Sequence, residues 1–263
     1  MKKATNIILI AIVLTAFKSS DNRELRYVQN TSFQAGEVIE FRAHYGFVNA
    51  AEARMEISSD IHYVNGRPCY KIDAYANSIG MFDFFMTVRD NWGSYLDTAS
   101  IIPQKSYRKL REGNYRKHEI VEFDHNKDTV VVQTYHYKKK YWKPKRFYGI
   151  PTNAQDIISG YYFLRTMDFS DFEGGEIFNI DAFFEDRVYF FKVKFVRREV
   201  LKTKIGKLNS LVFRPIMPDN KLFDGEDSIE IWLSDDENKV PLKIKAKMFI
   251  GAVEVDIKSY KKG

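Results

Sequence analysis

The chain contains a single cysteine, Cys69, so it cannot form an intramolecular disulfide bond. Metal-site spacing is also missing, because no histidine has a second ligand at the short separations typical of zinc sites. We therefore predict no metal and no cofactor, and expect ordinary surface or strand positions for the five histidines, which are His44, His62, His118, His125 and His136.

Catalytic signatures are absent too. The sequence has no glycine-rich phosphate loop, no nucleophile elbow and no HExxH pair. Asp235 and Asp236 are adjacent carboxylates, but neighbouring side chains on a strand point to opposite faces. We expect them to shape the turn in WLSDDENKVP, and the sequence predicts a protein that is not an enzyme.

Long hydrophobic runs are lacking beyond the first twenty residues. Lys2 and Lys3 precede the apolar run from Ile7 to Phe17, which is typical of a signal peptide and too short to span a bilayer comfortably. No cysteine near its end supports a lipid anchor. We predict a signal peptide over 1–20, export to the periplasm or the outer-membrane periphery, and a mature chain that is not an integral membrane protein.

Excess charge and linkers are also missing. A chain cut after Ser20 loses three lysines from a formal net charge of +6, which leaves +3. That balance does not favour a nucleic-acid partner. No Pro/Gly/Ser-rich tract or internal repeat divides the chain, so we predict a flexible leader over 21–32 and one domain over 33–260.

Strict alternation of apolar and polar residues is what the sequence has in abundance. It recurs in 39–47, 53–57, 189–195 and 242–250. A strand with one buried and one wet face has this pattern, and many such strands favour an antiparallel sheet that curls around its apolar side. The predicted fold class is mainly β, a single curled antiparallel sheet that forms a barrel or half-barrel.

The expected elements follow from this pattern and from turn residues such as Asn65-Gly66. One helix is predicted over 153–167, with Asn153 as its N-cap and an apolar face that docks on the sheet. The predicted strands are 37–48, 51–63, 67–77, 82–89, 92–97, 104–111, 115–124, 128–137, 176–184, 187–202, 205–214, 227–234, 239–250 and 251–260.

Basic and aromatic residues interleave in YHYKKKYWKPKR, residues 135–146. Outside the cytoplasm, anionic lipid headgroups or glycan phosphates are the polyanions such a stretch would meet. Lys138, Lys139, Lys140 and Trp142 are the candidate contacts. The alternative is a solvated hairpin whose lysines protect a sheet edge from aggregation.

Two charged pairs lie at predicted strand ends. Arg89 and Asp90 occur in VRDN, and Arg111 and Glu112 occur in REGNY. We expect them to satisfy backbone groups or to pair across strands. The alternative is a polar gate at the mouth of the sheet.

Five segments together resemble a known family. They are GEVIEFRAHYGFVNAAEAR (36–54), TVRDNWGSYLD (87–97), IPQKSYRKLREGNYR (102–116), AQDIISGYYFLRT (154–166) and IEIWLSDDENKVP (229–241). Their order and spacing are similar to the domain-of-unknown-function family numbered 3108, found in exported proteins of Gram-negative bacteria. The resemblance implies an exported, mostly antiparallel β structure and no particular activity.

Two functions stay open. The first is a periplasmic binding or carrier protein that holds an apolar or amphipathic ligand, such as a lipid, inside the curved sheet. The second is an envelope structural or assembly factor that binds a protein or glycan through its outer surface. A cavity of several hundred Å³ would favour the carrier, and a packed interior the surface binder. The candidate pocket residues are Phe41, Tyr45, Met55, Phe191, Phe195 and Trp232.

Overall fold

The structure is a computed structural model that describes residues 24–216, 228–248 and 251–263. The predicted signal peptide lies outside the described residues. The described part of the predicted leader contacts the sheet. Val28 N donates to Ala99 O over 2.8 Å, and Arg26 Nε donates to Ser100 O over 2.9 Å. Both acceptors lie in the turn between β4 (Arg89–Asp97) and β5 (Pro103–Glu112).

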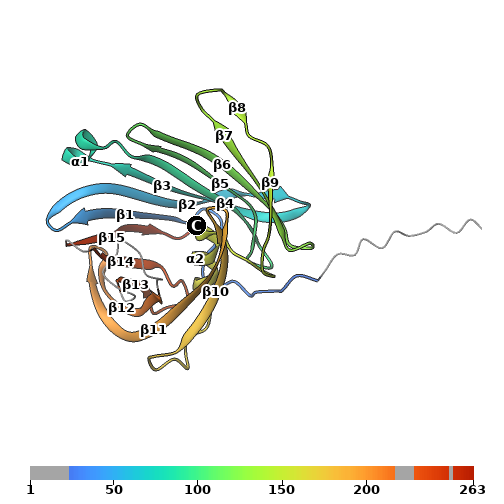
Figure 1. Ribbon diagram of the computed structural model, residues 1–263. Coiled ribbons are helices and arrows are strands. Elements are labelled where there is room, and N and C mark those ends of the chain that lie inside the picture. Colours follow the sequence, from blue (N-terminus) through green and yellow to red (C-terminus); the bar gives the residue numbers. More distant parts are fainter. Residues whose placement is uncertain (1–23, 217–227, 249–250) are drawn as a thin grey trace, which may run out of the picture.

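The described strands form one curled antiparallel sheet, which confirms the predicted fold class (Figure 1). Its order is β10-β11-β12-β13-β14-β15-β1-β2-β3-β4-β5-β6-β7-β8, with β9 also on β7. The strands are β1 Val38–Tyr45, β2 Val48–Val64, β3 Arg67–Ser78, β4 Arg89–Asp97, β5 Pro103–Glu112, β6 Tyr115–Asp124, β7 Thr129–His136, β8 Tyr141–Trp142, β9 Arg146–Gly149, β10 Ile177–Phe184, β11 Arg187–Thr203, β12 Gly206–Ile216, β13 Ile229–Ser234, β14 Pro241–Lys247 and β15 Ala252–Lys261.

The predicted helix is present as α2, Ile157–Thr166, but its start was placed wrongly. Asn153 adopts a positive φ of 60° in the preceding turn. The N-cap is Asp156, whose carboxylate accepts from Ser159 N over 2.7 Å, while Ser159 Oγ accepts from Asp156 N. This reciprocal pair is a capping box that uses serine at the third position.

The strand predicted at 82–89 is also wrong over most of its length. The structure has a short helix there, α1 Gly80–Phe85, and β4 begins at Arg89. Gly80 has a φ of 57°, which turns the chain out of β3. Phe82, Phe84 and Met86 alternate as in a strand with one apolar face, but Phe84, Phe85 and Met86 are also consecutive apolar residues, which breaks that pattern.

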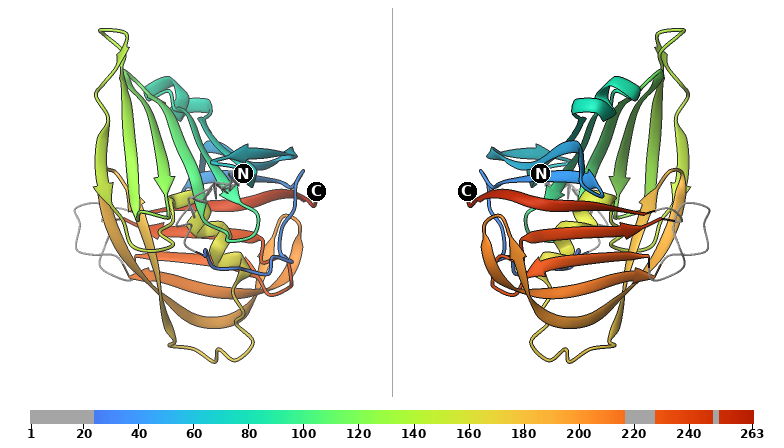
Figure 2. Two further views of the ribbon diagram at one scale, coloured as in Figure 1. Left: turned by 90° about the vertical axis from the view of Figure 1, so that its right-hand side faces the viewer. Right: turned by 90° about the vertical axis from the view of Figure 1, so that its left-hand side faces the viewer.

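Helix α2 lies inside the curve of the sheet, between the half that ends in β7 to β9 and the half that begins at β10 (Figures 1 and 2). Ile158 and Tyr162 pack against β2, β3 and β4, whereas Leu164 packs against Phe195 and neighbouring side chains of β10 to β13. The helix thus buries side chains against both halves, and this apolar burial stabilises the curl.

A buried ion pair fixes the end of α2. Arg165 and Glu37 are fully buried, and Arg165 Nη1 and Nη2 donate to the two Glu37 oxygens over 2.6 and 2.8 Å. The same guanidinium donates to Ser32 O and Asn238 O. A buried charge is tolerated when its donors are satisfied in this way.

The two ends of the sheet are joined through residues 150–156. Ile150 N donates to Asp128 O beside β7, while Gln155 N donates to Asp181 O of β10 over 2.8 Å. Phe183 N donates back to Gln155 O. The segment that precedes α2 therefore bridges the gap that keeps the sheet from closing.

Candidate functional site

None of the six candidate pocket residues lines either of the two cavities described below. Phe41, Phe195 and Trp232 are buried in packed clusters, and Met55 packs partly buried beside them. Tyr45 lies at the exposed end of β1. Phe191 is half-buried and stacks on Tyr189 at 5.3 Å between ring centroids.

A small cavity of about 30 Å³ lies on the concave side near the N-terminus of α2. Trp92 and Phe184 stack at its wall, and the Arg108 guanidinium lies over both rings. Arg108 Nε donates to Glu119 over 2.7 Å and Nη1 to Glu185 over 3.0 Å. These charges tie the β10–β11 turn to β5 and β6.

The same cavity is lined by Asp156. Its carboxylate is fully buried and accepts from Ser94 Oγ over 2.7 Å as well as from Ser159 N. Burial raises its pKa to about 6, although the hydrogen bonds from Ser94 and Ser159 lower it and so offset part of the rise. Asp156 is thus a buried carboxyl group whose protonation can change not far below neutral pH.

The four polar-gate candidates lie together at one end of the sheet. Asp90 Oδ1 accepts from Arg111 N over 3.0 Å, and the backbone of Glu112 forms an isolated antiparallel β-bridge with that of Val88. Burial and the neighbouring Asp90 raise the pKa of Glu112. Arg89 donates to Asp83 of α1 over 2.7 Å.

Helix α1 has its polar side turned inward. Asp83 accepts from Arg89 and, over 2.6 Å, from Ser78 Oγ, while Thr87 Oγ1 donates to Asp83 O. The Arg89 hydrogen bond lowers the pKa of Asp83. None of the residues of α1 is buried, and Phe84 and Phe85 are 86% and 77% exposed. Polar side chains anchor this helix, and its apolar side chains face solvent.

Neighbouring turns extend this surface. Because adjacent strands are antiparallel, the turn 45–48, α1, the turn 112–115 and the turn 136–141 all lie at the same end of the sheet (Figure 1). We call these four segments the rim. Ile79 N donates to Ala50 O, which holds α1 beside the first turn. The exposed apolar residues in or next to the rim are Phe47, Val48, Met81, Phe82, Phe84, Phe85, Met86, Tyr115, Tyr137, Tyr141 and Trp142.

The basic stretch forms one end of the rim. Trp142 packs against His118 and Tyr135, with ring centroids at 4.8 and 5.4 Å. Lys138, Lys139 and Lys140 are exposed in the turn between β7 and β8. No acidic residue occurs in the sequence between Asp128 and Asp156, so this end of the rim is strongly positive.

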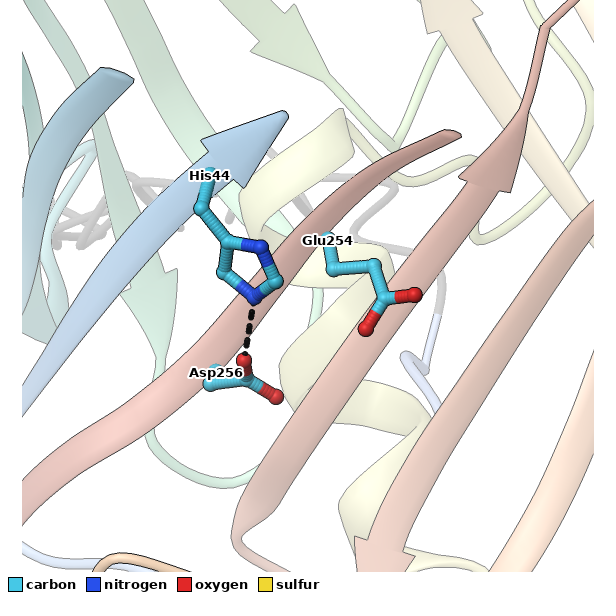
Figure 3. Close-up of side chains that lie close together, drawn as sticks. All are labelled: His44, Glu254 and Asp256. Atoms are coloured by element: carbon cyan, nitrogen blue, oxygen red, sulfur yellow. Dashed lines mark hydrogen bonds and ion pairs between the residues drawn. The ribbon is translucent and has the colours of Figure 1, made fainter. Parts of the chain in front are cut away.

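Among the described residues, one group of side chains has the proximity needed to hold a metal ion: His44, Glu254 and Asp256, whose ligand atoms lie within 4.8 Å of one another (Figure 3). His44 Nε2 is 2.7 Å from Asp256 Oδ2. Lys243 contacts both carboxylates, and Lys245 is 2.9 Å from Glu254. The lysines already supply the positive charge that the carboxylates attract, so we assign no metal site.

Sequence analysis missed α1, Arg108 and the His44 group. Glu254 and Asp256 are on β15 and meet His44 only because β15 pairs with β1. Arg108 meets Glu185 through the curl of the sheet. The signal for α1 was present in the consecutive apolar residues Phe84, Phe85 and Met86, which do not fit a strand with one wet face.

The fold and the open curl place the protein among β-barrel-like proteins. The chain belongs to the family described as protein of unknown function DUF3108, whose model matches residues 40–258. This family is the one predicted from the sequence segments. No curated protein matches the sequence.

Comparison with solved structures gives one match that shares the fold and two with lower TM-scores, all at low sequence identity. A β-barrel-like protein of domain of unknown function DUF1849 from Brucella abortus has a TM-score of 0.56 and 9% identity, over 88% of this chain and 99% of that one. A candidate lipoprotein from Parabacteroides distasonis ATCC 8503 has a TM-score of 0.34 and 8% identity, over 91% and 100%. A candidate exported protein with a YmcC-like fold from Bacteroides fragilis NCTC 9343 has a TM-score of 0.30 and 8% identity, over 90% and 99%.

Within the described residues, no helix is long and apolar enough to cross a membrane.

Proposed function

We propose that this protein is an exported, non-enzymatic envelope protein that attaches through its rim to an anionic lipid surface. The observation that carries the proposal is the orientation of α1, where Asp83 is held to the sheet and Phe84 and Phe85 face solvent. Large apolar side chains exposed at one place on a protein are typical of a contact surface.

The charge of the rim selects the partner. Exposed phenylalanines and methionines can enter the boundary between headgroups and acyl chains, and nearby lysines are attracted to anionic headgroups. Lys138, Lys139 and Lys140 supply that attraction beside Trp142, an aromatic residue favoured at membrane interfaces. A protein partner would also cover the apolar residues, but would not need this run of cations.

The carrier function has less support. Ligand pockets for small molecules usually have volumes of about 300 to 1,000 Å³. The concave cavity measures about 30 Å³, and α2 with its packed clusters occupies the place where an amphiphile would lie. By the criterion of interior volume, binding through the outer surface is favoured.

The test is flotation of the mature protein with vesicles of phosphatidylglycerol and phosphatidylcholine. We expect binding that rises with the anionic fraction. F84S/F85S should weaken it by at least about 100-fold, because burying each Phe side chain is worth about 1.5 to 3 kcal/mol. The matched control is Phe190→Ser, which changes a similarly exposed Phe on β11.

Replacing Lys138, Lys139 and Lys140 with glutamine should remove the preference for anionic vesicles, at about 1 kcal/mol per lysine. Equal binding of wild type and F84S/F85S would contradict the proposal. If the protein does not bind vesicles but binds an envelope protein through its rim, the partner is a protein and not a lipid surface.

A further inference from the structure

A polar groove of about 390 Å³ lies at the end of the sheet opposite the rim. It is bounded by the turn between β2 and β3 and by the ends of β5, β6 and β7. Asn65, Arg67, Gln104, Glu122 and His125 are among its lining residues. Its volume falls in the range of small-molecule sites, and it is separate from the concave cavity.

Two buried side chains in this groove have hydrogen-bonding atoms without a protein partner. Gln104 and His125 are each 4% exposed. His125 Nε2 donates to Pro103 O over 2.7 Å, so its Nδ1 is an acceptor, and this atom has no partner. Gln104 Oε1 accepts from Asn65 Nδ2, but Gln104 Nε2 has no acceptor. A buried hydrogen-bonding group without a partner costs about 1 to 3 kcal/mol of stability, and a ligand that pairs with the group would remove this cost.

The charged groups around the groove are already compensated. Arg67 donates to Asp97 through two nitrogens, and Asp124 pairs with Lys127 over 2.9 Å. Glu122 is exposed to solvent. Burial lowers the pKa of His125, which keeps its ring neutral near pH 7. The unmet donor and acceptor are therefore both neutral, and they favour an uncharged polar ligand over an ion.

We propose that this groove binds one or two sugar rings of an envelope glycan, with Gln104 Nε2 donating to the sugar and His125 Nδ1 accepting from a sugar hydroxyl. A hydroxyl both donates and accepts, so adjacent sugar hydroxyls match such a pair of groups. A peptide would bind most readily along a free strand edge. The strands that bound the groove are paired on both sides, which leaves no such edge there.

The test is a titration of the mature protein with N-acetylglucosamine and with its β-1,4-linked disaccharide, followed by NMR shifts and calorimetry. We expect saturable binding with a Kd of about 1 mM or below. Gln104→Met keeps the shape and removes the donor, and His125→Phe keeps the ring and removes the acceptor. Each should weaken binding at least about tenfold.

Both variants also remove a hydrogen bond inside the protein. Gln104→Met loses the bond from Asn65 Nδ2, and His125→Phe loses the bond to Pro103 O. Each loss should cost about 1 to 3 kcal/mol in the free energy of unfolding, so binding is compared under conditions where each variant is folded. The matched control Gln133→Met on β7, outside the lining residues, should keep binding. If either variant unfolds, the other still tests the proposal.

Absence of saturable binding by either sugar at about 50 mM, fifty times the expected Kd, would overturn the proposal. Binding that both variants retain would do the same. Tri-alanine that binds where the sugars do not would assign the groove to peptides instead. Vesicle flotation of Gln104→Met should match wild type, so failure of this proposal leaves the rim proposal standing.

Discussion

The two helices differ in which side faces the sheet: the apolar side in α2 and the polar side in α1. Helix α2 presents apolar side chains and Arg165 to the interior, and Asp156 and Ser159 cap its start. Helix α1 has no buried residue and no side-chain cap, and it is anchored through Asp83. Their apolar residues are similar in kind, but those of α2 stabilise the fold while those of α1 face solvent.

This difference separates stability from contact function. Burial of apolar area is the dominant favourable term in folding. Apolar residues that stay exposed in the folded protein are therefore available to bind another surface. A change in α2 should therefore be measured in unfolding, and a change in α1 in binding.

The largest effect is expected at the buried ion pair. Arg165→Met should destabilise the protein by about 3 to 5 kcal/mol, because it leaves the Glu37 carboxylate buried without its partner. Urea denaturation measures this. Arg54→Met is the control, since Arg54 pairs with Glu56 near solvent and should cost at most about 1 kcal/mol. Equal losses in both variants would mean that Glu37 finds another partner.

Adjacent isoleucines in α2 test which face is buried. Ile158 is 8% exposed and Ile157 is 42% exposed. Ile158→Ala should cost about 2 to 5 kcal/mol through lost burial and the cavity left behind. Ile157→Ala should cost less than about 1 kcal/mol, measured in the same urea series. The reverse order would place the helix with its other face inward.

The Asp156 cap should make the stability of α2 depend on pH. Its folded pKa, raised to about 6 from an ordinary 3.8, means that the folded protein binds this proton more tightly than the unfolded chain. The contribution is complete below about pH 4 and is lost as pH rises through 6, by roughly 1 to 3 kcal/mol.

Asp156→Asn keeps an acceptor for Ser159 N and removes the titration. The difference in unfolding free energy between wild type and this variant, measured from pH 3.5 to 7.5, isolates Asp156 from other carboxylates. A difference that stays constant with pH would show that the carboxylate ionises as freely as in the unfolded chain.

The smallest effect on stability is expected in α1. F84S/F85S should change the free energy of unfolding by less than about 0.5 kcal/mol, because both rings already face solvent. Thermal and urea unfolding check this alongside the flotation assay. A loss above about 2 kcal/mol would mean that α1 packs on the protein and is not a contact surface.

Much of the fold could be predicted from local pattern. Alternation indicated the strands around Phe41 and Phe195, because alternate residues are buried there, Ile39 and Phe41 on β1 and Val193 and Phe195 on β11. Asn65-Gly66 marked a turn, with both residues at positive φ. The apolar face near 157–163 indicated α2, although the cap moved to Asp156 because Asn153 forms part of a turn.

The candidate sites were less predictable, since their members meet through the curl. The sequence by itself determined the class of fold and the basic rim turn at Lys138–Lys140, which depend on neighbours along the chain. Tertiary structure alone decided that Arg165 meets Glu37, that His125 and Gln104 share a groove, and that the apolar side of α1 faces outward. Burial and pairing across distant strands arise only when the sheet curls, and a local pattern carries no information about which distant residue becomes the partner.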